Sequence, residues 1–171
     1  MTTSSTDQHR AAAHEKGPIQ VGLCTVSDTR TPDTDVNGAY LRERISAAGH
    51  TVLDSRIVPD EPEAVVAVLD AFVAAGAQVI LFNGGTGLSR RDRTYDALAS
   101  RLEKTLPGFG ELFRMLSWEQ VGAAAMLSRA VAGLYRGTVV ISTPGSPKAV
   151  SLAWEKLIAP ELAHLVWEAA R

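Results

Sequence analysis

The sequence is poor in cysteine and has no dominant sign of charge. Cys24 is the only cysteine among its 171 residues, which excludes an intrachain disulfide and a cysteine-based zinc cluster. Its 17 lysines and arginines are nearly balanced by 19 aspartates and glutamates, for a formal net charge of −2. A chain without a basic surplus creates no global field that attracts nucleic acid or an anionic membrane, and we expect neither as a partner.

Long apolar runs are absent as well. None approaches the roughly 20 residues that a membrane-spanning helix requires. Residues 1–17 lack the apolar segment of a signal peptide, and their polar, aperiodic composition predicts a disordered N-terminal tail. The remainder, residues 18–171, is long enough for a single domain with a substantial core. Together these absences favour a soluble, cytoplasmic protein.

The arrangements typical of nucleophilic catalysis are also missing. The sequence shows neither a Ser-His-Asp nor a Cys-His pattern. Cys24 lies within an apolar run that predicts a strand, so we expect a buried rather than a reactive thiol. His50 follows a predicted helix and His164 lies within one, and we interpret both as structural.

What the chain does contain is an alternation of short apolar runs and amphipathic segments. The apolar runs predict strands at residues 19–26, 51–58, 77–83, 129–135 and 138–142. Helical spacing predicts helices at residues 39–49, 61–76, 94–104, 107–122 (in two pieces) and 148–169 (broken near Pro160). This order predicts an α/β fold, a three-layer sandwich with a mostly parallel central sheet and helices on both faces.

Polar loops follow several of the predicted strands. Ligands of open parallel sheets bind beyond the carboxyl ends of the strands. The loops at 27–38, 83–94 and 143–148 leave such ends, and Pro59-Asp60-Glu61 follows the strand at 51–58. We therefore expect these four segments to meet at one edge of the sheet and to form the binding site.

The loop after the strand at 77–83 combines glycine, arginine and aspartate. GGTG at 84–87 offers backbone N–H groups that can wrap an anion, although a tight turn with positive φ would use the same glycines. Arg90, Arg91 and Arg93 surround Asp92, and guanidinium groups can hold phosphates in bidentate fashion. Neither GxxxxGK[ST] nor GxGxxG is present, which disfavours a P-loop NTPase and a Rossmann dehydrogenase.

A second candidate for anion binding opens the last helix. Ser146 is a natural N-cap, Pro147 suits the first helical position, and Lys148 adds positive charge beside free N–H groups. A capped helix start explains the same residues without any ligand. Both interpretations can hold together.

Aspartates in these loops supply the oxygen ligands that Mg²⁺ prefers. The acids concerned are Asp28, Asp33, Asp35, Asp60 and Asp92. Most acids in polar loops are solvated or cap a helix. Asp60 and Asp92 stand out, because the first follows a strand end and the second lies among arginines.

Six motifs in order resemble the MoaB/Mog family of molybdenum cofactor biosynthesis. They are TVSDTRTPDTDVNGAYLRERISAAGH, IVPDEPE, GGTGLSRRDRTYDAL, PGFGELFRMLS, SRAVAG and TPGSPKAV, and they span roughly residues 19–169. The resemblance implies an α/β fold that assembles as a trimer or as a hexamer. It also implies transfer of AMP from Mg·ATP to the terminal phosphate of molybdopterin, with release of pyrophosphate.

The resemblance further implies roles for individual residues. The two essential acids, which would also bind Mg²⁺, are Asp60 and Asp92. The residues that would bind molybdopterin and the nucleotide are Ser27, Asp28, Asn37, Gly38, Gly84, Gly85, Thr86, Gly87, Arg90, Pro144, Gly145, Ser146 and Lys148.

The sequence departs from the family pattern at three places. Asn83 stands where the family has Thr or Ser before GGTG, and Asn37 stands where it has Ser. Tyr95 and Asp96 replace the Pro-Glu pair of the R-D-x-T-P-E pattern. The alternative to an adenylyltransferase is a non-catalytic molybdopterin-binding or scaffold protein of the same pathway, and the presence of Asp60 and Asp92 favours the enzyme. A competence-damage-type nucleotide hydrolase is disfavoured, because the chain has no second domain.

The segment at 107–122 carries more apolar residues than a short connecting helix needs. Phe109, Phe113, Leu116 and Trp118 could mediate the self-association that the resemblance implies. The same four residues could instead pack into the core of one subunit.

Overall fold

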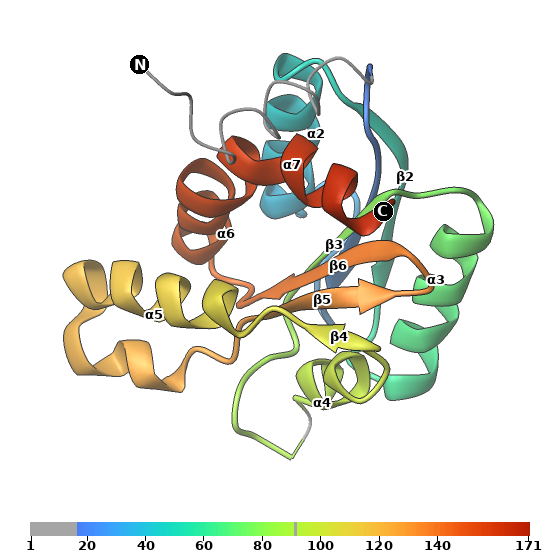
Figure 1. Ribbon diagram of the computed structural model, residues 1–171. Coiled ribbons are helices and arrows are strands. Elements are labelled where there is room, and N and C mark those ends of the chain that lie inside the picture. Colours follow the sequence, from blue (N-terminus) through green and yellow to red (C-terminus); the bar gives the residue numbers. More distant parts are fainter. Residues whose placement is uncertain (1–16, 91) are drawn as a thin grey trace, which may run out of the picture.

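The computed structural model describes residues 17–90 and 92–171. A six-stranded sheet lies between two groups of helices, which confirms the predicted three-layer α/β fold (Figure 1). Apart from the exposed Gly17, the predicted N-terminal tail lies outside the described residues, as does Arg91. Disorder of the tail therefore stays a prediction. None of the helices in the described part of the chain is both long and apolar enough to cross a membrane.

The sheet is mostly parallel and has the strand order β2-β1-β3-β6-β5-β4. Its parallel strands are β1 (Gln20–Val26), β2 (Thr51–Val58), β3 (Val79–Asn83) and β6 (Thr138–Thr143). Two antiparallel strands complete one edge, β5 (Val131–Tyr135) and β4 (Lys104–Thr105). Every residue of β3 and β6 is buried, as expected for parallel strands that are covered on both faces.

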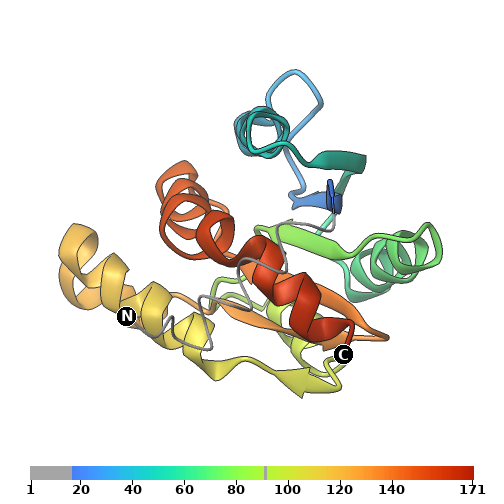
Figure 2. The same ribbon diagram turned by 45° about the horizontal axis from the view of Figure 1, so that its top comes forward.

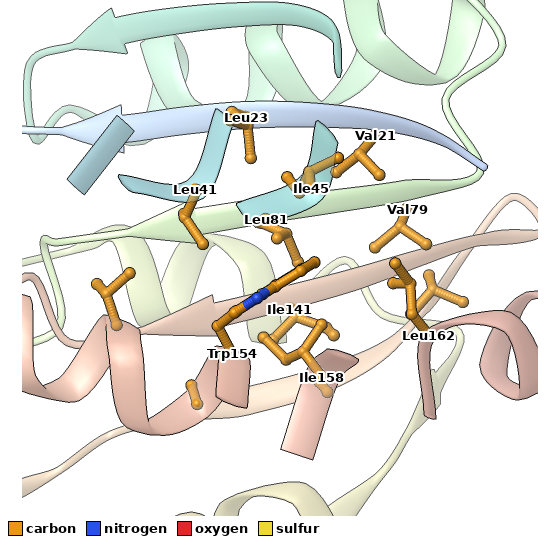
Figure 3. Close-up of a cluster of buried hydrophobic side chains, with 14 of the residues drawn as sticks. Val21, Leu23, Leu41, Ile45, Val79, Leu81, Ile141, Trp154, Ile158 and Leu162 are labelled. Carbon is orange, nitrogen blue, oxygen red and sulfur yellow. The ribbon is translucent and has the colours of Figure 1, made fainter. Parts of the chain in front are cut away.

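Helices cover both faces of this sheet (Figures 1 and 2). The helices on one face are α2 (Val36–Ala47), α5 (Pro107–Val121), α6 (Pro147–Ala153) and α7 (Ala159–Ala169). Those on the other face are α3 (Pro62–Ala74) and α4 (Thr94–Ala99). Figure 3 shows Trp154 lying with Leu81 and Ile141 in the cluster between the sheet and the first group.

The predicted helix at 94–104 is too long. It ends at Ala99, and Lys104 and Thr105 form β4 instead. Backbone hydrogen bonds hold this edge strand: Glu103 N donates to Leu134 O at 2.8 Å, and Leu106 N donates to Ala132 O at 2.7 Å. Such pairing with a strand far along the chain is a tertiary contact, which local helical spacing does not reveal.

The segment at 107–122 is one helix, α5, rather than the two predicted pieces. The helical residues that follow it form a separate 3₁₀ segment, η1 (Gly122–Leu127). Gly122 separates the two with a φ of 57°, a value that glycine adopts without strain.

The predicted break near Pro160 is a π-helical turn, η2 (Trp154–Ile158), that joins α6 to α7. Within an α-helix the Pro160 ring would collide with the carbonyl group of Lys156, and one backbone hydrogen bond would be lost. In the wider turn Ala159 N–H donates to Trp154 O, five residues back. The helix therefore continues through the proline instead of breaking.

Cys24 lies in the middle of β1 and is completely buried, as predicted. Burial raises the pKa of its thiol to about 12, so the thiol stays protonated near neutral pH. The native chain should therefore resist a thiol reagent at mildly alkaline pH. The same chain unfolded in guanidinium should take up one label. Rapid labelling of the native chain would show that β1 opens readily.

Candidate functional site

Three parallel strands end side by side at the edge of the sheet that is formed by the carboxyl ends of its strands. Thr25 of β1 is paired with Asn83 of β3, and Asn83 is paired with Thr143 of β6. The chain turns from β1 to β2 in one direction and from β3 to β6 in the other, so this edge is a topological switch point. Ligands of open α/β sheets bind at such a point. The loops after β1, β3 and β6 meet there, as the sequence predicts.

Two buried asparagines connect the strand ends. Asn37 Nδ2 donates to Asn83 Oδ1 at 2.9 Å and to Gly145 O at 2.8 Å. Asn83 Nδ2 in turn donates to Thr25 Oγ1 at 3.0 Å. They are the only asparagines of the chain. Both are departures from the pattern of the family that the sequence resembles, and the structure shows that they are partners of each other.

Asp35 extends this network and starts α2. Its Oδ2 accepts from Thr25 Oγ1 and its Oδ1 accepts from Gly38 N, both at 2.9 Å, and the side chain is buried. A Cβ on Gly38 would lie 2.2 Å from Asp35 Oδ2, so this position requires glycine. The predicted loop at 27–38 is therefore too long, because Asn37 and Gly38 lie in the first turn of α2.

Gly84 and Gly85 form a tight turn directly after β3. Their φ angles are +101° and +63°. A Cβ on Gly84 would lie 2.2 Å from Val26 O, and one on Gly85 would lie 2.2 Å from Thr94 Oγ1. The turn interpretation is thus correct for these two glycines. Gly84 N–H donates to Thr143 O at 3.0 Å, so this group is not available to a ligand.

The N–H groups that follow are available. The backbone N–H groups of Gly85, Thr86, Gly87 and Leu88 have no acceptor among residues 17–90 and 92–171. Unpaired backbone donors are uncommon and bind water or a ligand. Four in a row beside a switch point suit an anion such as a phosphate. The anion-binding and turn interpretations of GGTG are therefore compatible.

Asp60 lies against the first part of this loop. Its Oδ1 accepts from Arg93 N at 3.2 Å, Thr94 N at 3.1 Å and Thr94 Oγ1 at 2.8 Å, so it satisfies donors at the start of α4. A Cβ on Gly85 would lie 2.8 Å from the same oxygen. Asp60 N donates to Asp28 Oδ1 at 3.2 Å, which links the loop after β2 to the loop after β1.

Asp92 lies against the second part of the loop. Its Oδ2 accepts from Ser89 N at 3.2 Å. A Cβ on Gly87 would lie only 2.6 Å from that oxygen. The two predicted acids therefore flank the loop, with Asp60 beside Gly85 and Asp92 beside Gly87.

These two carboxylates fit Mg²⁺ that is bound together with a phosphate. Within the described ranges no group of three or more histidine, cysteine, aspartate or glutamate side chains could hold a metal ion by itself. Mg²⁺ does not need such a cage, because it is commonly held by one or two carboxylates together with substrate phosphates. Both acids lie over glycines, where a Cβ would collide with them, so a metal ion on a phosphate at the loop would have carboxylate oxygens on two sides.

The other predicted site residues surround this centre. Ser27 Oγ accepts from Thr29 N and Arg30 N, so it organises the first loop. Ser146 Oγ accepts from Ala149 N at 3.2 Å, which confirms the helix cap. Gly145 and Lys148 are exposed, Pro144 is half-buried and Arg90 is exposed at the tip of the long loop.

Two cavities adjoin these residues. One of about 560 Å³ extends from the first loop over the end of β2, and its lining includes Ser27, Asp28, Arg30 and Arg42. The other, of about 360 Å³, lies between the first turns of α2 and α6, and its lining includes Asn37 and Lys148. The edge of the sheet therefore has room for two bound groups.

Sequence reasoning assigned no role to Arg129, which follows η1. Its guanidinium reaches across to the loop of β3 and is bound by Asp96, with Nη1 3.1 and 3.0 Å from the two carboxylate oxygens. The guanidinium carbon lies 4.9 Å from the centre of the Tyr95 ring. Tyr95 and Asp96, the remaining departures from the family pattern, thus hold Arg129. The only signal in the sequence was its place in the SRAVAG motif.

Known proteins resemble this chain over most of its length. Residues 22–164 match the protein family described as "Probable molybdopterin binding domain". The molybdenum cofactor biosynthesis protein B of Halalkalibacterium halodurans is 47% identical over 168 residues, 96% of each chain. A crystal structure of a molybdenum cofactor biosynthesis protein B has a TM-score of 0.86 at 46% identity, covering 90% of this chain and 97% of that chain. The tungsten cofactor synthesizing protein MoaB from Pyrococcus furiosus has a TM-score of 0.83 at 36% identity, covering 90% and 98%.

The two asparagines should be energetically coupled. Asn37→Ala and Asn83→Ala should each lower the free energy of unfolding by about 1–3 kcal/mol, because each leaves a buried polar group unpaired. The double variant should cost less than the sum, by about 0.5–3 kcal/mol, since the second change removes that unpaired group. Urea unfolding at one protein concentration gives the free energy of unfolding of the wild type, the two single variants and the double variant. Asn83→Ala with the exposed Ser100→Ala is the additive control, and additivity of the asparagine pair would show no coupling.

Proposed function

Because this chain belongs to the MoaB/Mog family of molybdenum cofactor biosynthesis proteins, we propose that it adenylylates molybdopterin. It would transfer AMP from Mg·ATP to the terminal phosphate of molybdopterin and release pyrophosphate. The observation that supports this best is the row of four loop N–H groups, between Asp60 and Asp92, that have no acceptor among the residues that the structure describes. Its partners would be these small molecules and further copies of itself, in the cytoplasm.

The reaction is a nucleotidyl transfer, a substitution at the α-phosphorus of ATP with pyrophosphate as the leaving group. An oxygen of the molybdopterin phosphate forms a bond to the α-phosphorus of ATP, and the bond between that phosphorus and the α–β bridging oxygen breaks. The attacking oxygen is already ionised near neutral pH, so no strong general base is needed. The position of His50 is consistent with this, because His50 does not lie at the proposed site. Its Nδ1 accepts a hydrogen bond from Ile19 N near the opposite edge of the sheet. The protein then has to align the two phosphates and stabilise the negative charge.

The described residues can supply both functions. The N–H groups of residues 85–88 would donate to phosphate oxygens, and Lys148 would add positive charge from the start of α6. Asp60 and Asp92 would hold Mg²⁺, which when bound neutralises charge on the triphosphate. The buried asparagines would keep these loops in register.

One observation favours the alternative, a non-catalytic molybdopterin-binding or scaffold protein. Oδ1 of Asp60 accepts three hydrogen bonds at the start of α4, which is what a purely structural aspartate does. The loop N–H groups without an acceptor in the described part of the chain would serve a binding protein equally well. Turnover therefore has to be measured.

Asp60→Asn and Asp92→Asn should each lower the rate of pyrophosphate release on the order of a hundredfold or more. Asparagine keeps the shape of aspartate and an oxygen that can accept hydrogen bonds, but it lacks the negative charge that Mg²⁺ requires. The measurement is pyrophosphate release from ATP and molybdopterin in the presence of Mg²⁺. Binding of molybdopterin should be affected less than turnover.

Glu63→Gln on α3 is the matched control, because it removes an equal charge from an exposed position. Thermal melting of all variants shows whether they remain folded. Near wild-type turnover in both aspartate variants would mean that the two acids only cap the loop. Pyrophosphate release by none of the chains, with molybdopterin still bound, would support the non-catalytic alternative.

We also propose self-association through α5 and η1, which project from the rest of the molecule in both views (Figures 1 and 2). Of the four residues considered from the sequence, Phe113 is buried in the core and Phe109 and Leu116 pack against it. Only Trp118 is exposed, at 62%. The large exposed apolar residues that accompany it on α5 and η1 are Leu112, Met115, Val121, Met126 and Leu127. A face of this kind suits a protein partner, and the family resemblance favours a trimer or hexamer.

Trp118→Glu should convert this oligomer to monomers, since it places a charge on the apolar face. Light scattering at micromolar concentration should give a multiple of the chain mass for the wild type and a single chain mass for the variant. Ala74→Glu, which adds the same charge at an exposed position of α3, should leave the mass unchanged. A monomeric wild type would contradict the proposal.

A further inference from the structure

We propose that Arg129 is a positioning residue that turns the backbone of residues 86–88 into an anion cradle and, through the peptide that joins Asp92 to Arg93, holds Asp60 beside it. Its guanidinium binds carbonyl groups of the loop and leaves the loop N–H groups to a ligand. The inference deepens the adenylyltransferase proposal and rests on it for the catalytic measurement. The effect on the loop itself can be measured without any turnover.

Arg129 directs its hydrogen bonds to the protein. Nε donates to Thr86 O at 2.9 Å, and Nη2 donates to Gly87 O at 2.6 Å and to Asp92 O at 2.9 Å. Nη1 donates to Asp96, as described above, and the side chain is only 22% exposed. A guanidinium has five N–H donors, and five hydrogen bonds are formed. Arg129 is thus committed to shaping the loop, whereas the exposed Arg90 remains accessible to an anion.

These contacts decide the direction in which the loop N–H groups point. In a trans peptide, the C=O of one residue and the N–H of the next point in opposite directions. All described peptide bonds are trans. Since Arg129 attracts the carbonyls of Thr86 and Gly87, the N–H groups of Gly87 and Leu88 are turned away from it. These are two of the four N–H groups that have no acceptor in the described part of the chain.

The peptide between Asp92 and Arg93 extends the same argument to Asp60. Its carbonyl accepts from Arg129, and its N–H, on the opposite side, donates to Asp60 Oδ1 at 3.2 Å. One peptide group therefore lies between the guanidinium and the carboxylate. A cation on the carbonyl polarises the peptide and strengthens donation by its N–H. Arg129 and Asp60 thus bind this peptide group of the loop from opposite sides.

Lysine cannot replace arginine in this role. The ammonium group is a compact charge without the planar arrangement of donors that reaches three carbonyls and a carboxylate together. It would also lose the stacking on Tyr95. Arg129→Lys should therefore behave like Arg129→Ala, although it keeps the charge.

The test combines hydrogen exchange of the loop with turnover. In Arg129→Ala and Arg129→Lys, amide exchange in residues 84–93 should be faster than in the wild type, and exchange in β1, β3 and β6 should be unchanged. The kcat for pyrophosphate release should fall on the order of a hundredfold, as for loss of preorganised donors, with a smaller change in the KM for ATP. Added guanidinium ion should partly restore kcat in Arg129→Ala, because it can occupy the vacated space.

Arg114→Ala is the matched control, because Arg114 Nη1 donates to Ser128 O beside Arg129 but does not reach the loop. It should change neither loop exchange nor kcat. Wild-type exchange of the loop in both Arg129 variants would overturn the proposal. So would equal effects of Arg114→Ala and Arg129→Ala, or a loss of kcat that guanidinium does not restore. If the wild type releases no pyrophosphate, the adenylyltransferase proposal fails, and loop exchange together with calorimetric binding of ATP still decides the role of Arg129.

Discussion

The hydrogen bond between Asn37 and Asn83 is the interaction on which the geometry of the site depends. Three parallel strands end at a buried edge, and each end brings polar groups that must be paired away from water. A carboxamide can donate and accept at once, so two of them connect Thr25, the start of α2 and the carbonyl of Gly145 without a charge. The loops that leave β1, β3 and β6 start from positions that this pair sets.

The departures from the family pattern occur in contacting groups. Asn37 and Asn83 bind each other, and Tyr95 and Asp96 together hold Arg129. The two acids and the glycine loop stay as the pattern has them. The departures from the family pattern that the sequence resembles are therefore found in residues that support the proposed site.

Much of this architecture could be predicted from local pattern. Buried strands are recognisable in the sequence as apolar runs. Because the sheet is mostly parallel, the polar loops that follow its strands meet at one edge. What could not be predicted depends on contacts between distant segments. Lys104 and Thr105 become a strand only because β5 is beside them. Arg129 lies 43 residues from Thr86 in the chain, and its role appears only when η1 brings it to the loop. The loop N–H groups that lack an acceptor within residues 17–90 and 92–171 likewise follow from peptide orientation, which residue identity alone does not specify.

The hydrogen bonds that Oδ1 of Asp60 accepts affect how a metal ion would bind to the protein. With Oδ1 taken by three donors, only Oδ2 lacks a protein donor among the described residues, and the carboxylate could offer an ion a single oxygen. Single-oxygen coordination from so few protein groups gives weak affinity for a free cation. Under the proposed function, the metal would enter and leave as part of the nucleotide complex and would not be a permanent component. Occupancy of the metal position would then follow the concentration of the nucleotide.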